Sequence, residues 1–445
     1  MSYISPINSR YKAPIMSNIW CSDNKIITMR QLWIDLATFQ KELGVPVITE
    51  EGIGEMEQNK RCIDYSAIQN YESRFKHDIM AHIYAYSDLC PTGKNMLHLG
   101  ATSNFINDNV DMILLKESLH HIVNKAMSVF DILKEKSFEY SSMPTLAYTH
   151  LQAAQLITVG KRFCFWNSDI LLDIENFINL ITRLPFRGIK GTVGSEDTIL
   201  KLFENNHEKC DLLNSKLSNK YGFSKPLIIC GQTYSRKYDL LVINSLSSIC
   251  QSIYKMMNDI RLLSSKGELY EKFENEQIGS SAMPYKINPI TCEKICSLCR
   301  LVSNHEMNMS QTYTSQWLER SLDDSAIRRI IFPDCFMIVE HILNETHKCL
   351  RDLFVNKIQI EKNVEEHFNN ILSEQIILCG VKMGYNRQDI HERLRKLLIN
   401  NKHADFNSDE VIKNIFENNQ ISLNHNDYIG RCVEQIQLFY SDCVI

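Results

Sequence analysis

The chain has 445 residues, of which 44% are hydrophobic and 23% charged, and its formal net charge is −5 at pH 7. This length predicts two or three domains, and the weakly acidic balance argues against non-specific binding to nucleic acid or to a membrane as the main function. The fifteen cysteines are scattered along a long chain, which favours reduced, buried thiols over a disulfide framework.

The chain begins with MSYISPINSRYKAP, which lacks the apolar stretch of a secretory signal. No apolar run approaches the ~18 residues that cross a membrane. We therefore expect a cytoplasmic protein. Ten prolines punctuate the chain, the last of them Pro333, and the stretches between them contain few glycines, so long helices are permitted. No series of alternating residues predicts a sheet.

The first candidate binding residues, Arg10 and Tyr11, lie near the N-terminus. An arginine can make bidentate contacts with a phosphate, although a mobile N-terminus explains the pair equally well. Residues 76–82 read KHDIMAH, and their two histidines are five positions apart rather than the four of a helical zinc pair. We therefore predict no metal site here, and the plain interpretation is a helix with exposed ends.

Residues 98–103 read HLGATS, which by spacing alone predicts only a helix N-cap at Thr102 or Ser103. Apolar residues then recur at spacings of four and three between residues 115 and 133, and again between 242 and 263. Both stripes extend over about three heptads and predict helices packed at shallow angles in a bundle. The stripes comprise Leu115, Leu119, Ile122, Ala126, Val129 and Leu133, and Val242, Leu246, Ile249, Ile253, Met256, Ile260 and Leu263.

Residues 149–155 read THLQAAQ and contain His150. An imidazole with its ordinary pKa of about 6.5 suits proton transfer at neutral pH, although a lone histidine is more often structural than catalytic. Residues 188–194 are rich in glycine, but they lack the flanking strands and helix of a dinucleotide site.

Residues 279–289, GSSAMPYKINP, are the most informative segment and are called the signature loop below. Its two prolines break helix and its glycine opens a turn, so it is a loop between helical segments. Hydroxyls, an ammonium and an amide concentrated on such a loop favour a functional site on a rigid scaffold over a plain connector. Lys286, Asn288 and backbone N–H groups can stabilise negative charge on a substrate carboxylate.

Two polar or reactive segments follow the signature loop. Cys292, Cys296 and Cys299 have the spacing of a radical iron–sulfur motif, but the same spacing describes one face of a helix, which is the interpretation we prefer. Residues 320–329, RSLDDSAIRR, either present arginines to a phosphate or form a solvated charged face.

These motifs resemble the fumarase/aspartase superfamily and, within it, the adenylosuccinate lyase family of animals. The signature loop is similar to the superfamily's GSSxMPxKxNP, and the motifs occur in the family's order from Arg10 to Gly430-Arg431. The other matching segments are RQLW (30–33), KHDIMAH (76–82), HLGATS (98–103), THLQAAQ (149–155), GQTYSRK (231–237) and LDDSA (322–326).

The resemblance implies that Ser280 is the base that removes a proton from the carbon beside a substrate carboxylate and that His150 is the acid that protonates the leaving nitrogen. The substrate-binding positions carried over are Arg10, Tyr11, Lys76, His77, Asp78, Thr102, Ser103, Gln232, Lys286, Asn288, Lys294, Arg320, Ser325 and Arg329. Among these, Arg10, Arg320 and Arg329 would hold a phosphate. Lys76, Ile287 and Lys294 depart from arginines usual in relatives; a lysine keeps the charge but loses the planar fork.

The resemblance also implies an all-α fold with three domains: an N-terminal helical domain at 1–102, a central long-helix bundle at 103–355 and a C-terminal helical domain at 356–445. Four bundles would assemble into a homotetramer in which each site takes segments from three chains. A 30-residue helix spans about 45 Å, so one bundle has difficulty gathering all the motifs. The implied reaction uses no cofactor and no metal, and it releases fumarate from two purine nucleotides, adenylosuccinate and the succinylated carboxamide ribotide of purine synthesis.

Three alternatives stay open at this point. Argininosuccinate lyase or a related enzyme would share the superfamily, but a substrate without phosphate has no use for the three arginines. A helical scaffold that has lost activity would predict decay at Ser280, His150 and Lys286, and all three are intact. An iron–sulfur enzyme would be brown and would lose activity with its iron.

Overall fold

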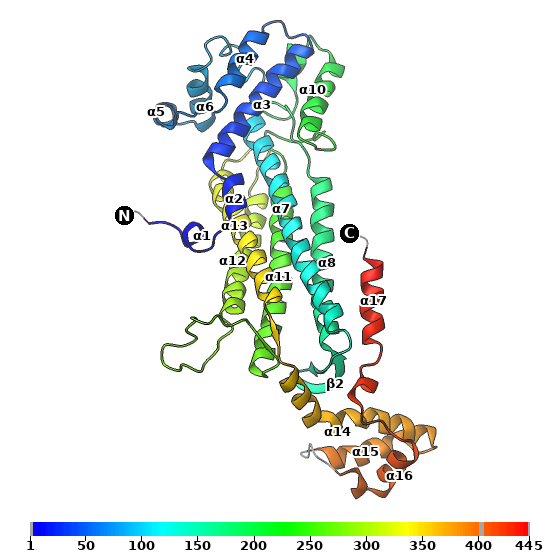
Figure 1. Ribbon diagram of the computed structural model, residues 1–445. Coiled ribbons are helices and arrows are strands. Elements are labelled where there is room, and N and C mark those ends of the chain that lie inside the picture. The colour runs from blue at the N-terminus through cyan, green and yellow to red at the C-terminus, as the bar shows by residue number, and fades with distance from the viewer. Residues whose placement is uncertain (1–2, 400–404, 444–445) are drawn as a thin grey trace. The chain divides into compact units, whose positions relative to one another are not determined.

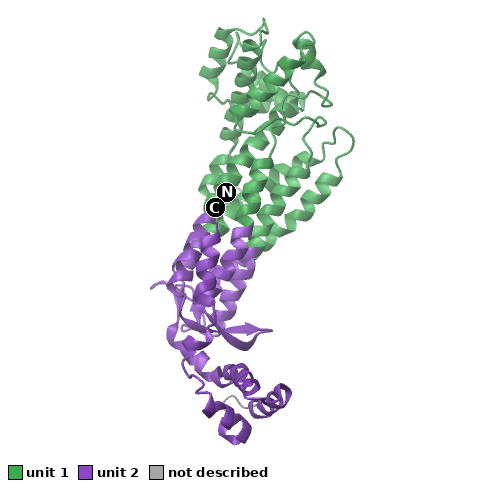
Figure 2. Ribbon diagram, turned by 90° about the vertical axis from the view of Figure 1, so that its right-hand side faces the viewer, with its two compact units in different colours: residues 1–126, 173–251, 297–344 green, residues 127–172, 252–296, 345–445 purple. Residues whose placement is uncertain are grey.

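The computed structural model describes residues 3–399 and 405–443, and this part of the chain is mostly helical (Figure 1). No helix in these ranges is long and apolar enough to cross a membrane. The predicted all-α class is confirmed. Contacts divide the chain into two compact units (Figure 2). Unit 1 comprises residues 1–126, 173–251 and 297–344, and unit 2 comprises residues 127–172, 252–296 and 345–445.

Unit 1 contains shorter helices together with segments of five long ones. Thr49, Asp64 and Asn206 cap three of the shorter helices by accepting hydrogen bonds from backbone N–H groups of the first turn. The shorter helices are α1 (Pro6–Ser9), α2 (Pro14–Ile19), α3 (Ser22–Glu42), α4 (Glu50–Asn59), α5 (Tyr65–Phe75), α6 (Asp78–Ser87), α9 (Asp197–Leu202) and α10 (His207–Lys220). The long ones are α7 (Ser103–Glu139), α8 (Val159–Arg183), α11 (Lys237–Ser265), α12 (Ile290–Thr314) and α13 (Asp324–Arg351).

The long helices bury the two apolar stripes that the sequence predicts. The residues of the 115–133 stripe lie on α7 and those of the 242–263 stripe on α11, and all of them are buried. The prediction that prolines end helices is wrong at Pro333, which lies inside α13. Phe332 and Phe336 on either side of it are buried and stack on Trp20, with ring centroids 6.1 and 5.8 Å apart, so tertiary packing holds the helix across the proline.

Unit 2 contains two short antiparallel strand pairs that the sequence did not predict. In the first pair, Leu146 and Leu156 lie opposite each other and join a buried apolar cluster with residues between 364 and 421. The strands are β1 (Pro144–Thr149) with β2 (Gln152–Thr158), and β3 (Leu269–Tyr270) with β4 (Phe354–Val355). The remaining elements are α14 (Lys357–Lys382), α15 (Arg387–Leu398), η1 (Phe406–Ser408), α16 (Glu410–Asn418), η2 (His425–Tyr428) and α17 (Cys432–Asp442).

The two compact units alternate along the chain, so they do not correspond to consecutive domains. The division into domains at 1–102, 103–355 and 356–445 stays a prediction.

A glycine at the start of α8 provides a test of the packing in unit 2. A Cβ at Gly160 would lie 2.2 Å from the carbonyl oxygen of Ser137 and 2.7 Å from the backbone nitrogen of Ser141, which leaves no room for a methyl group. A Cβ at Gly54 in α4 would meet nothing within 4 Å. We expect Gly160→Ala to lose about 1–3 kcal/mol of stability through overpacking, and the control Gly54→Ala to gain about 0.5–1 kcal/mol from helix propensity. Thermal and urea unfolding would measure both changes. If Gly160→Ala unfolds at the same midpoint as wild type, the close packing around Gly160 is contradicted.

Candidate active site

A cleft of about 860 Å³ in unit 1 gathers many of the predicted binding residues. This volume suits a ligand of the size of a nucleotide. Its walls come from segments of α3, α5, α6, α7 and α13 and from the chain around residue 232. The predicted residues that line it are Lys76, His77, Asp78, Ser103, Gln232, Arg320, Ser325 and Arg329.

The break between α5 and α6 places three of these residues. Lys76 ends α5 in the left-handed region, with φ of 52°, and His77 caps α6 through its Nδ1, which accepts a hydrogen bond from the Met80 N–H at 3.3 Å. Asp78 then accepts a hydrogen bond from Arg329 at 2.6 Å. The plain interpretation of residues 76–82 as one helix with exposed ends is therefore wrong, because the chain turns within the motif and presents its polar residues to the cleft.

The start of α13 is held by a buried cluster of charges. The Arg236 guanidinium donates to Asp324 at 2.6 Å and to Asp108 of α7 at 2.9 Å. Arg320 donates to the other oxygen of Asp324 at 2.8 Å. Burial favours a higher pKa for the Asp324 carboxyl, but the arginines, Arg236 first, lower it below its usual range, so the group is ionised at neutral pH.

A second buried arginine extends this cluster. Arg328 donates to Asp239 at 2.7 Å and to the Tyr234 hydroxyl at 2.6 Å, and it pairs with Asp111 at 3.0 Å. Burial raises the pKa of Asp239, while Arg328 pulls it down. Of this cluster, sequence reasoning singled out Arg320 alone and missed the other members. Arg236, Asp324 and Arg328 lie within the motifs already quoted, whereas Asp108 and Asp111 gave no signal beyond a spacing of three on one helix.

Gln232 reaches the cleft from a segment that packs tightly against residue 319. Its backbone N–H donates to the Glu319 carbonyl at 2.9 Å, and its side-chain oxygen accepts from Asn104 at 3.2 Å. A Cβ at the preceding Gly231 would lie 2.6 Å from the Glu319 carbonyl oxygen, so only glycine permits this approach.

Three predicted residues of unit 1 do not line the cleft. Arg10 is exposed, and Tyr11 packs against His341 with ring centroids 5.3 Å apart. The Thr102 hydroxyl is buried and has no hydrogen-bond partner within the described ranges.

Unit 2 holds His150 in a strained turn. Thr149 pairs with Gln152, so His150 and Leu151 alone connect β1 to β2, and both have positive φ, 52° and 61°. Two-residue turns of this type favour Asn-Gly, and side chains with a Cβ are strained in them. Such an outlier at an exposed histidine supports a functional reason for keeping it there.

A buried carboxylate anchors the hairpin that carries His150. Glu268 accepts hydrogen bonds from Tyr148 of β1 at 2.7 Å and from Asn363 of α14 at 3.0 Å, and it pairs with Arg162 of α8 at 3.6 Å. Burial first, and then Glu268, raise the pKa of the Tyr148 hydroxyl, so the phenol remains a donor. The hairpin is thus fixed by bonds near its tip.

The signature loop runs between β3 and α12 and closes on itself (Figure 1). Asn288 donates to the Gly279 carbonyl at 2.9 Å, and the Ser280 oxygen accepts from the N–H groups of Ala282 at 3.3 Å and Met283 at 3.0 Å. Two N–H donors aimed at one hydroxyl oxygen stabilise negative charge on it, which is what a serine base requires.

The other predicted residues of this region differ in availability. The Lys286 side chain is exposed and makes no ion pair among the described residues, so its ammonium is free for a ligand. Lys294 on α12 pairs with Glu345, so its charge is already compensated. In the described ranges no hydrogen bond joins His150 to Ser280.

The cysteines of α12 face different partners. Cys292 contacts the thiol of Cys349, Cys296 approaches the Tyr254 carbonyl at 3.8 Å, and Cys299 contacts Cys250. The iron–sulfur alternative is therefore unsupported, because the spacing reflects one buried face of a helix.

Comparisons with known proteins match the chain to the same family that the motifs resemble. A family model described as a lyase matches residues 63–303. The adenylosuccinate lyase of Schistosoma mansoni is 39% identical over 473 residues, covering 99% of this chain and 97% of its own. That of Saccharomyces cerevisiae is 36% identical, covering 98% and 94%. Among solved structures, a fumarate lyase from Mesorhizobium sp. BNC1 has a TM-score of 0.82 at 18% identity, covering 97% of this chain and 99% of its own, and so shares the fold.

A half-buried histidine in the HLGATS segment predicts a pH dependence. Trp33 donates to His98 Nδ1 at 2.8 Å, and burial lowers the His98 pKa from 6.5 to about 4. Since the folded pKa is depressed, this stabilisation is complete above pH 6.5 and is lost as the pH falls towards 4. We expect wild type to lose more thermal stability over that range than His98→Asn, which keeps an acceptor but does not titrate. If the melting temperatures of the two proteins fall equally as the pH is lowered, the lowered pKa assigned to His98 is contradicted.

Proposed function

The chain belongs to the adenylosuccinate lyase family, and we propose that it cleaves the C–N bond of adenylosuccinate by β-elimination, giving AMP and fumarate. It acts in the same way on the succinylaminoimidazole carboxamide ribotide, giving the carboxamide ribotide and fumarate. One observation carries the proposal: eight of the residues that correspond to the family's binding positions line a single cleft.

The proposed mechanism uses one base, one acid and a set of charge-stabilising groups. Ser280 takes a proton from the succinyl carbon beside the carboxylate, and Lys286, Asn288 and backbone N–H groups stabilise the charge that the carboxylate takes up. The C–N bond then breaks, and its electron pair remains with the nitrogen. His150 gives that nitrogen a proton, so the nucleotide leaves neutral at this position and fumarate is released.

The cleft supplies the binding groups for the nucleotide. Arg320 and Arg329 approach from the segment around the start of α13, with the Ser325 hydroxyl between them in sequence. Guanidinium groups suit the bidentate recognition of a phosphate. Lys76 lines the same cleft without an ion pair among the described residues, so it adds a positive charge that a ligand can use.

We further propose a homotetramer whose active sites take segments from three chains. His150 and Lys286 lie on exposed turns and loops. Long helices also expose large apolar side chains, as expected where subunits meet. Examples are Phe165 and Leu172, each 59% exposed on α8, and Met307, 64% exposed on α12.

We also propose that the protein is cytoplasmic. All fifteen cysteines are free thiols, which fits that compartment.

Turnover and its dependence on Ser280 test the function. Purified protein given adenylosuccinate should form AMP and fumarate in equal amounts. Ser280→Ala should lower kcat by about 10²–10⁴ because a positioned base is lost, while the fold remains, since the hydroxyl lies on a loop. Ser281→Ala, a neighbouring exposed serine, is the matched control and should retain activity. No product from wild type would refute the function; an active Ser280→Ala protein would move the base elsewhere.

Binding of the phosphate is tested at Arg329, whose side chain is 57% exposed and paired with Asp78. A charge-assisted contact contributes roughly 1.5–3 kcal/mol, so Arg329→Ala should raise KM about ten- to a hundredfold and change kcat less. Arg351→Ala is the control, because Arg351 is 55% exposed and also paired, with Asp352, but lies outside the cleft. Steady-state kinetics with both purine substrates would measure the effect, and an unchanged KM would show that Arg329 does not hold the phosphate.

Complementation tests the shared sites. Inactive His150→Ala and inactive Ser280→Ala proteins, unfolded and refolded together, should form mixed tetramers in which some sites contain both native residues, so partial activity should return. Each variant refolded alone is the control. If differential tags demonstrate mixed tetramers that stay inactive, His150 and Ser280 do not act from different chains.

A further inference from the structure

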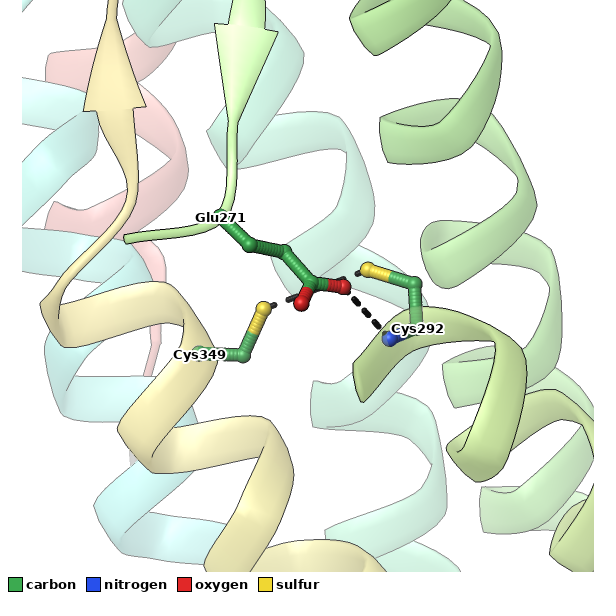
Figure 3. Close-up of side chains that lie close together, drawn as sticks. All are labelled: Glu271, Cys292 and Cys349. Carbon is green, nitrogen blue, oxygen red and sulfur yellow. Dashed lines mark hydrogen bonds between the residues drawn. The ribbon is translucent and has the colours of Figure 1, made fainter. Parts of the chain in front are cut away.

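Three potential metal ligands meet beside the signature loop. Glu271 directly follows β3, Cys292 lies in the first turn of α12 and Cys349 in the last turn of α13 (Figure 3). One ligand atom from each lies within 4.8 Å of the other two, and the two sulfurs are 3.9 Å apart. Both thiols are buried, whereas Glu271 is partly exposed. None of the three belongs to the proposed catalytic or binding residues.

The spacing of these atoms suits a tetrahedral ion. With Zn–S bonds of about 2.3 Å, tetrahedral geometry separates two sulfurs by about 3.8 Å, close to the distance observed. The Glu271 carboxylate is held in place because its oxygens accept hydrogen bonds from the backbone N–H groups of Cys292 at 2.6 Å and Thr291 at 3.0 Å. A carboxylate has about four acceptor positions, so it can keep both bonds and still bind an ion.

The donor set selects a class of cation. Two thiols and a carboxylate suit Zn²⁺ and similar thiolate-preferring ions, whereas Mg²⁺ prefers oxygen ligands alone. The thiolate is the form of cysteine that binds a metal, so a bound cation would displace the thiol protons.

We propose that Glu271, Cys292 and Cys349 form a binding site for a thiolate-preferring divalent cation, with water completing the coordination on the partly exposed side. Glu271 and Cys292 stand at the two ends of residues 272–291, the segment that carries the signature loop. The bound ion joins both ends of this segment to the last turn of α13. It therefore restrains the loop without touching the reacting groups.

Cobalt binding tests the site directly. Reduced, chelator-treated protein titrated with Co²⁺ should show a thiolate-to-cobalt charge-transfer band that saturates at one ion per chain. Cys349→Ser and Glu271→Gln should weaken this binding at least tenfold. Cys296→Ser is the matched control, because Cys296 is a buried cysteine of the same helix whose thiol approaches a different partner, the Tyr254 carbonyl, and it should keep the band. Thermal melting of each variant without metal checks that it folds.

Proteolysis tests the restraint on the loop. Lys272 and Lys286 offer trypsin two cleavage sites in the segment. Zn²⁺ should slow cleavage there in wild type and in Cys296→Ser, but not in Cys349→Ser. The site is refuted if Cys349→Ser binds Co²⁺ as wild type does, if Mg²⁺ displaces Co²⁺ as readily as Zn²⁺ does, or if the reduced protein, protected from air, takes up no cobalt. Cobalt binding with unchanged cleavage would refute the restraint.

Discussion

The cleft depends on the ion pairs that the buried side chain of Arg236 makes with two aspartates. Its guanidinium joins Asp108 on α7 to Asp324 at the start of α13. A buried charge costs several kcal/mol unless it is paired in good geometry, so each of these groups fixes the others. Arg320 also pairs with Asp324. The nearby Arg328 interacts electrostatically with Asp108, the other carboxylate that Arg236 contacts. The orientation of Arg320, which we propose binds the phosphate, therefore follows from this cluster, whose members Asp108 and Asp324 also line the cleft.

In unit 2, the buried carboxylate of Glu268 likewise fixes the position of a predicted site residue, His150. The turn at His150 and Leu151 stores strain of about 1–3 kcal/mol per residue, which must be offset by the surrounding structure. Glu268 supplies bonds to the hairpin and to the helices around it. The histidine is thus presented on an exposed but fixed turn. A more favourable Asn-Gly turn would remove the strain and the imidazole together, so a turn that departs from local preference is what the proposed role of His150 requires.

The sequence predicted the helices well because spacings of three and four directly encode which face is buried. It predicted much of the cleft because Lys76, Gln232 and Arg329 lie in recognisable motifs, although their roles stay predictions. It missed the β1–β2 hairpin because His150-Leu151 lacks the glycine or asparagine that normally signals such a turn. It missed Asp108 because a single aspartate on a helix reads as a surface residue until its arginine partner is brought to it by the fold.

If Arg329 holds the phosphate as proposed, its pairing with Asp78 gives the cleft selectivity at some cost in affinity. A guanidinium has five N–H donors, and the carboxylate occupies one nitrogen at 2.6 Å, so other donors stay available to a phosphate. The carboxylate orients the arginine before the ligand arrives and lowers the local positive charge. A small anion without further contacts then gains little from the cleft. In the proposed binding mode, a nucleotide also reaches Gln232 and Ser103 in the cleft wall, so its binding depends on shape as well as charge.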